Sequence, residues 1–105
     1  MVFTLTFVEN LFRLLLDGAP LFIGLSAAIA ALAVAVGRIE GWNLVDSVYY
    51  GFITATTVGY GDIVPKHVIG KLVSILLPLI GLVATGIMVA LAVEAADITF
   101  KQLNP

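Results

Sequence analysis

The sequence predicts an all-α membrane protein in which two transmembrane helices flank a re-entrant segment. Hydrophobic residues make up 61% of the 105 positions and charged residues 11%, whereas soluble domains average about 45–50% and about 25%. Two apolar runs, at about 19–36 and about 72–93, approach or reach the roughly 20 residues that cross a bilayer. The stretch between them, 44–64, is apolar but interrupted by Asp46, Asp62 and glycines.

The composition limits which kinds of partner and which covalent links the chain is expected to have. There are no cysteines, so disulfides are excluded. The net charge of -2 says nothing about nucleic acid, but no basic run is present, so nucleic acid is not an expected partner. The hydrophobic composition predicts the lipid bilayer as a partner. The first apolar residues are interspersed with Glu9, Arg13 and Asp17, a pattern unlike a cleaved signal peptide.

Residues 1–18 predict an interfacial helix that precedes the first span. Its apolar residues share one side, with charges elsewhere. Gly18 is a predicted helix end, and Pro20 suits the first turn of the next helix. The alternative is that this segment extends the first span as one longer helix. The predicted apolar side consists of Phe7, Leu11, Leu14 and Leu15.

Residues 19–37 predict the outer transmembrane helix. This run is rich in alanine and contains Gly24 and Ser26, small residues that allow close helix packing, and we expect this face to contact the second span. Residues 37–43 then predict a short polar connection, in which Trp42 is a candidate anchor at the membrane interface.

Residues 44–64 predict a half-helix followed by an extended segment. Either Asn43 or Asp46 can cap the helix, which we expect over about 45–56. Non-helical backbone at membrane depth occurs only where protein buries it or water lines it. The extended segment therefore predicts a protein-buried or water-lined feature such as a pore.

Seven consecutive residues, Thr56 to Asp62, read TTVGYGD. This run resembles the selectivity filter of potassium channels. From the first span to the second, the chain resembles the two-transmembrane-helix pore of prokaryotic potassium channels. A Gly-rich turn between two membrane helices is the alternative, but a turn needs only one or two such residues and not this order.

The resemblance implies that backbone carbonyls of Thr57, Val58, Gly59 and Tyr60 bind K⁺ as the permeant ion. Rings of carbonyls can replace the hydration shell of the ion. Aiming successive carbonyls at one axis requires backbone conformations that glycine enters most easily, which predicts Gly59 and Gly61 as the permissive positions. The side chains of Val58 and Tyr60 then point away from the axis, and the Thr57 hydroxyl adds an oxygen.

Residues around the filter differ from those of the family. Gly61, Asp62, Tyr49 and Tyr50 are the expected filter supports, and the two tyrosines stand where many members have a tryptophan pair. Ile53 replaces a glutamate that in one type pairs with the aspartate matching Asp62. Asp62 therefore lacks that carboxyl partner.

Residues 70–98 predict the inner helix, with Pro78, Gly81 and Gly86 as candidate gating residues. Proline kinks a helix and glycine loosens it. In the resembling channels a glycine at the spacing of Gly81 from Gly70 acts as a hinge, whereas helix packing is the alternative role. Beyond this helix, Glu94 and Asp97 predict either an acidic ring at the inner mouth or a solvated helix end.

The resemblance implies a single pore domain over 1–105 that forms a homotetramer and conducts K⁺ passively, gated by inner-helix movement. It would not be an enzyme. It further implies a multi-pass protein of the cell membrane with both termini cytoplasmic. Many relatives continue into a ligand-sensing cytoplasmic domain, of which Lys101 to Pro105 give no sign, so a missing regulatory domain stays open.

Two other functions remain open from the sequence. One is a regulatory membrane subunit that does not conduct. The other is a poorly selective cation channel, against which Tyr60 argues, because the tyrosine position is typically altered in such channels. His67, after the filter, is either an external pH sensor or ordinary polar surface.

Overall fold

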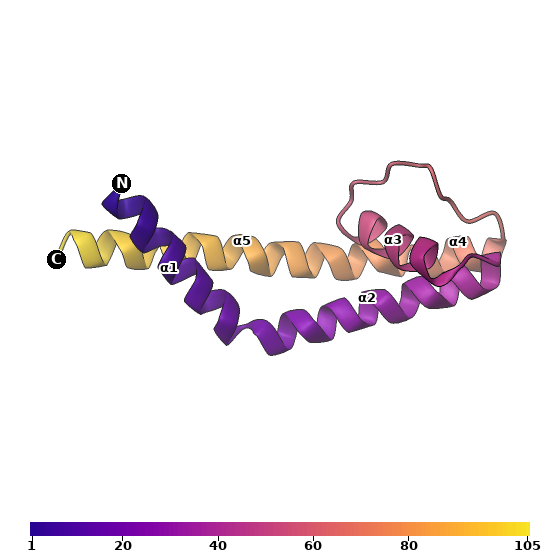
Figure 1. Cartoon of the computed structure of the whole chain (residues 1–105), viewed down its shortest axis with the longest axis horizontal. Helices are drawn as coiled ribbons and strands as arrows, with labels where there is room; N and C mark the ends of the chain where they lie inside the picture. The colour runs from indigo at the N-terminus through magenta and orange to yellow at the C-terminus, as the bar shows by residue number, and fades with distance from the viewer.

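The computed structural model describes all 105 residues as five helices and contains no strand. The chain measures 58 × 24 × 20 Å, and α2 and α5 run side by side along its long axis. The α3 helix lies at one end, and both termini lie at the other (Figure 1). The helices span Val2–Asp17 (α1), Ala19–Glu40 (α2), Leu44–Ala55 (α3), Val68–Ser74 (α4) and Leu76–Leu103 (α5).

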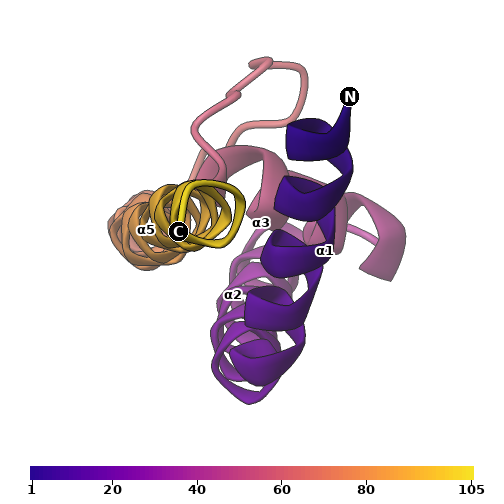
Figure 2. The same cartoon turned by 90° about the vertical axis from the view of Figure 1, so that its left-hand side faces the viewer.

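The α1 and α2 helices are separate, with Gly18 between them and Pro20 in the first turn of α2. The α1 helix slants from the start of α2 toward the C-terminal end of α5 and packs on the last part of α5 (Figures 1 and 2). The break favours a distinct helix over an extension of the first span.

The outer helix is longer than predicted, because α2 continues past residue 37 to Glu40. The residue that ends it is Gly41, whose φ of 80° is a left-handed conformation that glycine adopts at low cost. Gly37 is instead a buried contact point, where a β-carbon would overlap the side chain of Ser47. The predicted polar connection thus shrinks to 41–43.

The α2 helix packs on α3 and also, as expected, on both parts of the second span, α4 and α5, but Gly24 and Ser26 are not its points of closest approach. Both residues are exposed, and nothing lies within 4 Å of a β-carbon built at Gly24. The close approach occurs further along, where Ala33 of α2 is fully buried against Gly51 of α3. The small alanine side chain of α2 therefore allows α3 to approach closely.

The inner helix predicted over 70–98 begins at Val68 and continues to Leu103, with a one-residue interruption at Ile75. Pro78 explains the interruption. A proline lacks the N–H that would bond to the carbonyl four residues earlier, here Ser74, and its ring crowds that carbonyl. The backbone at Ile75 instead forms a tighter bond to Leu72.

The chain has a small core. Only 15 of 105 residues are buried, and the core cluster lies where α2, α3 and α5 meet. Both α2 and the α4–α5 unit are long and apolar enough to cross a membrane, and most of the large apolar side chains of the α4–α5 unit are exposed. These features confirm the all-α membrane fold with two spans. The core consists of Ile29, Val36, Tyr50, Ala55 and Leu77.

Candidate functional site: the segment that follows the pore helix

The α3 helix is fixed at its start by Asn43. The Asn43 side chain accepts a hydrogen bond of 2.7 Å from the backbone N–H of Asp46, so Asn43 is the cap, and Asp46 is the acidic residue of the first turn. The helix ends at Ala55, where its carbonyls carry the negative end of the helix dipole. The TTVGYGD segment begins at this end.

The backbone of the segment alternates as the glycine pattern predicted. Gly59 and Gly61 have φ values of 57° and 79°. Thr57 also has a positive φ, 65°, which the sequence did not predict, because a threonine rarely adopts this conformation.

The backbone N–H groups at the start of the segment are hydrogen-bonded, whereas its carbonyl oxygens are not. The N–H of Thr57 donates to Thr54, and the N–H groups of Val58 and Gly59 donate to Ile53 at 3.0 and 3.2 Å. No hydrogen bond within the chain reaches a carbonyl oxygen of residues 56–64. All residues from 56 to 62 are exposed. The carbonyl oxygens of this segment therefore have no hydrogen-bond partner within the chain.

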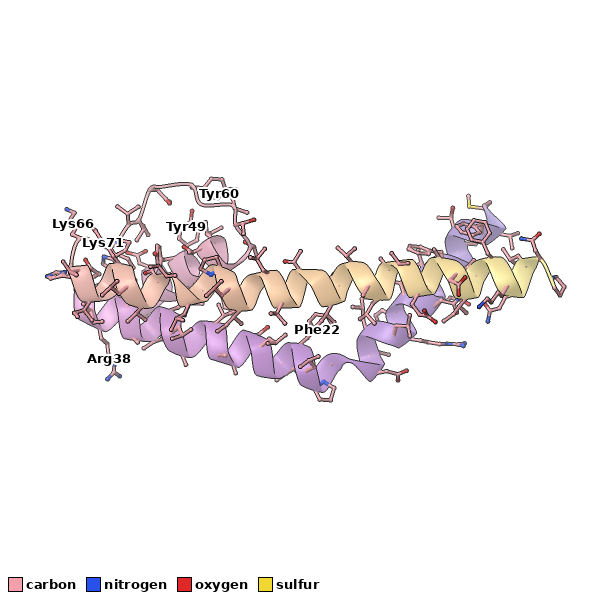
Figure 3. All side chains as sticks on the ribbon, turned by 180° about the vertical axis from the view of Figure 1, so that it is seen from behind. Phe22, Arg38, Tyr49, Tyr60, Lys66 and Lys71 are labelled. Carbon is pink, nitrogen blue, oxygen red and sulfur yellow. The ribbon has the colours of Figure 1, made fainter.

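A cleft of about 180 Å³ separates the segment from α3 and is lined by Tyr49, Ile53, Tyr60 and Asp62, among others. Across it the Tyr49 hydroxyl donates to an Asp62 carboxylate oxygen at 2.9 Å. Figure 3 shows Tyr49 on α3 beneath the arch of the loop that carries Tyr60. The carboxylate of Asp62 is therefore bound by the hydroxyl of Tyr49. Ile53, which stands where one type of potassium channel has a glutamate, lines the same cleft but is apolar.

The second tyrosine of the pair has a different environment. Tyr50 is buried in the core, and its ring packs edge-on against Trp42 with centroids 5.0 Å apart. Trp42, considered above as an interface anchor, thus contacts the pore helix. Tyr49 holds the segment by a hydrogen bond, whereas Tyr50 holds α3 by packing.

The end of α3 lies directly against Gly81 of α5. A β-carbon at Gly81 would overlap the carbonyl group of Ala55, which is fully buried. Nothing lies within 4 Å of a β-carbon at Gly86. Gly81 therefore has a packing contact in this structure, and a hinge role for Gly81, Pro78 or Gly86 stays a prediction.

Glu40 joins the end of α2 to the start of α4. Its carboxylate accepts hydrogen bonds from the backbone N–H of Lys66 at 2.7 Å and of His67 at 3.0 Å, and His67 Nδ1 lies 3.0 Å away. The Glu40 side chain is 3% exposed. A β-carbon at Gly70 would press on this carboxylate. Lys66 lies at this end of the molecule (Figure 3).

The opposite end of α5 carries the predicted acidic residues. Asp97 pairs with Lys101 at 3.0 Å, one helical turn away. Such an exposed pair contributes little to stability, but it offsets the charge of Asp97. Glu94 has no ion-pair partner in the chain.

Two spanning helices around a re-entrant half-helix, with unpaired carbonyls at its end, define the pore domain of an ion channel. The comparison with protein families agrees, because the family model described as ion channel matches residues 18–97. The chain belongs to this ion channel family, and its relatives are potassium channels. Ion channels are not enzymes, in agreement with the sequence prediction.

The similarity to curated proteins is local. The chain is 41% identical over 49 residues to potassium channel subfamily K member 12 of Rattus norvegicus, covering 45% of the chain and 11% of that protein. It is 40% identical over 47 residues to a voltage-gated potassium channel of Aeropyrum pernix, covering 45% and 16%. The chain thus spans a small part of these relatives. No solved structure gives a significant match.

Proposed function

We propose that the chain forms the pore of a potassium-selective channel, which conducts K⁺ passively through the carbonyls of Thr57, Val58, Gly59 and Tyr60. The row of unpaired carbonyl oxygens beside the end of α3 carries this proposal. Carbonyl rings replace the hydration shell of K⁺, and the names of the relatives refer to potassium. The negative end of the α3 dipole favours a cation there.

Four copies of the chain together complete the ion-binding site. One chain supplies one strand of carbonyls, and a ring requires several strands around a symmetry axis. The exposure of residues 56–62 and of the apolar side chains on α5 leaves surface for these copies and for lipid. We place the homotetramer in the cell membrane with the filter outward and both termini cytoplasmic.

Gating is assigned to the inner helix. The α5 helix contacts the last residue of α3, Ala55, at Gly81, and it extends to the opposite end of the molecule (Figure 1). Movement of its lower part, with Pro78, Gly81 and Gly86 as the candidate points of bending, would open and close the path below the filter.

Planar-bilayer recording with K⁺ on one side and Na⁺ on the other tests the ion selectivity. We expect a reversal potential that favours K⁺, and we expect Gly59→Ala to abolish the current because a β-carbon resists the positive φ. Gly41→Ala is the matched control, since its φ is 80° and nothing lies within 4 Å, but it lies outside the filter.

Three results contradict parts of this proposal. A reversal potential near zero would indicate a poorly selective cation channel. Assembled protein that carries no rubidium flux in vesicles would indicate a non-conducting subunit. Cross-linking or native mass measurement that gives only monomers and dimers in a conducting preparation would refute the tetramer.

A further inference from the structure

The pore helix α3 meets the outer helix α2 at two points where a glycine leaves no room for a side chain. A β-carbon at Gly37 of α2 would overlap the side chain of Ser47, and a β-carbon at Gly51 of α3 would overlap that of Ala33. All four residues are buried. At both points the two helices are therefore as close as their atoms allow.

These two glycines serve close approach and not a special backbone conformation. The glycines with a positive φ are Gly41, Gly59 and Gly61, whereas Gly37 and Gly51 lie inside helices with ordinary helical backbone. Glycine is among the least favourable residues inside a helix. The gain that offsets this cost is the contact between α2 and α3.

The two contacts share one register. A step of four residues along α3, from Ser47 to Gly51, corresponds to a step of four residues back along α2, from Gly37 to Ala33. Rows of side chains spaced by four residues interdigitate in this way when helices pack. A helix can shift along such a row only by about one turn, ~5.4 Å. The register therefore fixes where α3 lies along α2.

The same register continues to the end of α3. The next pair is Ile29 with Ala55, which are 5% and 0% exposed and belong to one core cluster. Ala55 also meets the second span, because its carbonyl lies where a β-carbon at Gly81 would be. The end of α3 thus packs on both α2 and α5, and a movement of α3 away from one of them disturbs its contact with the other.

The position of α3 is passed to the filter through hydrogen bonds. The carbonyl of Ile53 accepts bonds from the N–H groups of Val58 and Gly59 at 3.0 and 3.2 Å. At the other end of the segment, the Tyr49 hydroxyl donates to Asp62 at 2.9 Å. Both parts of the filter segment are bound to α3, so a displacement of α3 also displaces the row of carbonyl oxygens.

We propose that Ala33 and Gly51 are positioning residues through which the outer helix sets the ion selectivity of the channel. Their contact sets the distance between α2 and α3, and with it the positions of the carbonyl oxygens. Selectivity depends on the arrangement and number of carbonyl dipoles around the ion. This role rests on the proposed channel function, whereas the contact itself does not.

Exchanging the sizes of the two residues tests the contact. Gly51→Ala adds a β-carbon that overlaps the Ala33 side chain. With Ala33→Gly as well, the nearest atom to that β-carbon is the Cα of residue 33 at 3.4 Å, an ordinary contact. Gly51→Ala should lower the temperature at which the oligomer dissociates, and the double variant should restore it. Gly24→Ala is the control on α2, since nothing lies within 4 Å, and it should not lower this temperature.

Ion selectivity separates positioning from a purely structural role. In bi-ionic recordings below the dissociation temperature, Gly51→Ala should lower the preference for K⁺ over Na⁺ about tenfold, which corresponds to ~1.4 kcal/mol. The double variant should recover the wild-type preference to within about twofold. Normal selectivity in Gly51→Ala would overturn the proposal even if its stability fell, and so would a double variant that is no more selective than Gly51→Ala.

Two further measurements keep the test decisive. Ala33→Gly alone removes the contact without a clash, so it serves if Gly51→Ala does not assemble; it should lower the same preference about twofold, and no change would overturn the proposal. A wild-type protein without K⁺ current would refute the channel function and the selectivity role together. The dissociation temperatures would still decide the contact, which is refuted if Gly51→Ala is as stable as Gly24→Ala.

Discussion

Replacing Gly81 by alanine separates packing from bending in the inner helix. The new β-carbon would overlap the Ala55 carbonyl, which is backbone and cannot rotate away. Overpacking of this kind typically costs ~1–3 kcal/mol, while glycine to alanine inside a helix returns ~0.8–1.0 kcal/mol. Gly86→Ala gains the same helix propensity without the overlap. The two variants should therefore differ in stability by ~1–3 kcal/mol per chain.

The assay is thermal dissociation of the oligomer, measured beside bi-ionic reversal potentials on the same preparations. We expect Gly81→Ala to dissociate at lower temperature than Gly86→Ala and to lose part of its ion selectivity, because Ala55 directly precedes the filter segment. Equal stability of the two variants, with normal selectivity and altered open probability in Gly81→Ala alone, would refute the packing argument and establish a hinge.

Three further variants test the filter and its supports. Tyr60→Asp should lower the preference for K⁺ over Na⁺ at least tenfold, measured by reversal potential, and an unchanged potential would contradict the filter assignment. Tyr49→Phe removes the hydrogen bond to Asp62, and it should shorten the conducting lifetime of the filter about two- to tenfold. In a double-mutant cycle with Asp62→Asn, the effects of the two substitutions on this lifetime should not add. Glu40→Gln should lower the melting temperature more than His67→Gln, because Glu40 also accepts two backbone N–H bonds. An equal drop in melting temperature in the two variants would contradict this expectation.

Local patterns explain what the sequence could predict. The order of helices follows from runs of apolar residues, and the conformations of Gly59 and Gly61 follow from the steric freedom of glycine. The cap at Asn43 lies three residues from its partner. Each of these features depends on neighbours in the chain, so the amino-acid order alone contains the required information.

Contacts between distant residues account for what the sequence did not predict. Glu40 and His67 are 27 positions apart, and Asn10 and Thr99 are 89 apart. No sequence periodicity relates residues that are so far apart. A single polar residue in an apolar run is equally compatible with a buried and with an exposed position. The sequence places the end of the outer helix at residue 37 instead of Glu40 for a related reason, since either Gly37 or Gly41 can end a helix until the tertiary contact of Gly37 with Ser47 is known.

The location of both termini at the end of the molecule away from α3 has a practical consequence (Figure 1). A flexible Gly/Ser linker can join the last residue of one copy to the first residue of the next without crossing the bilayer. Genes encoding such tandem copies would fix how many subunits of an assembly carry a given substitution. A channel with one altered Gly59 among otherwise normal copies could then be compared with one in which every copy is altered, which would measure how far the carbonyl rings act as a unit.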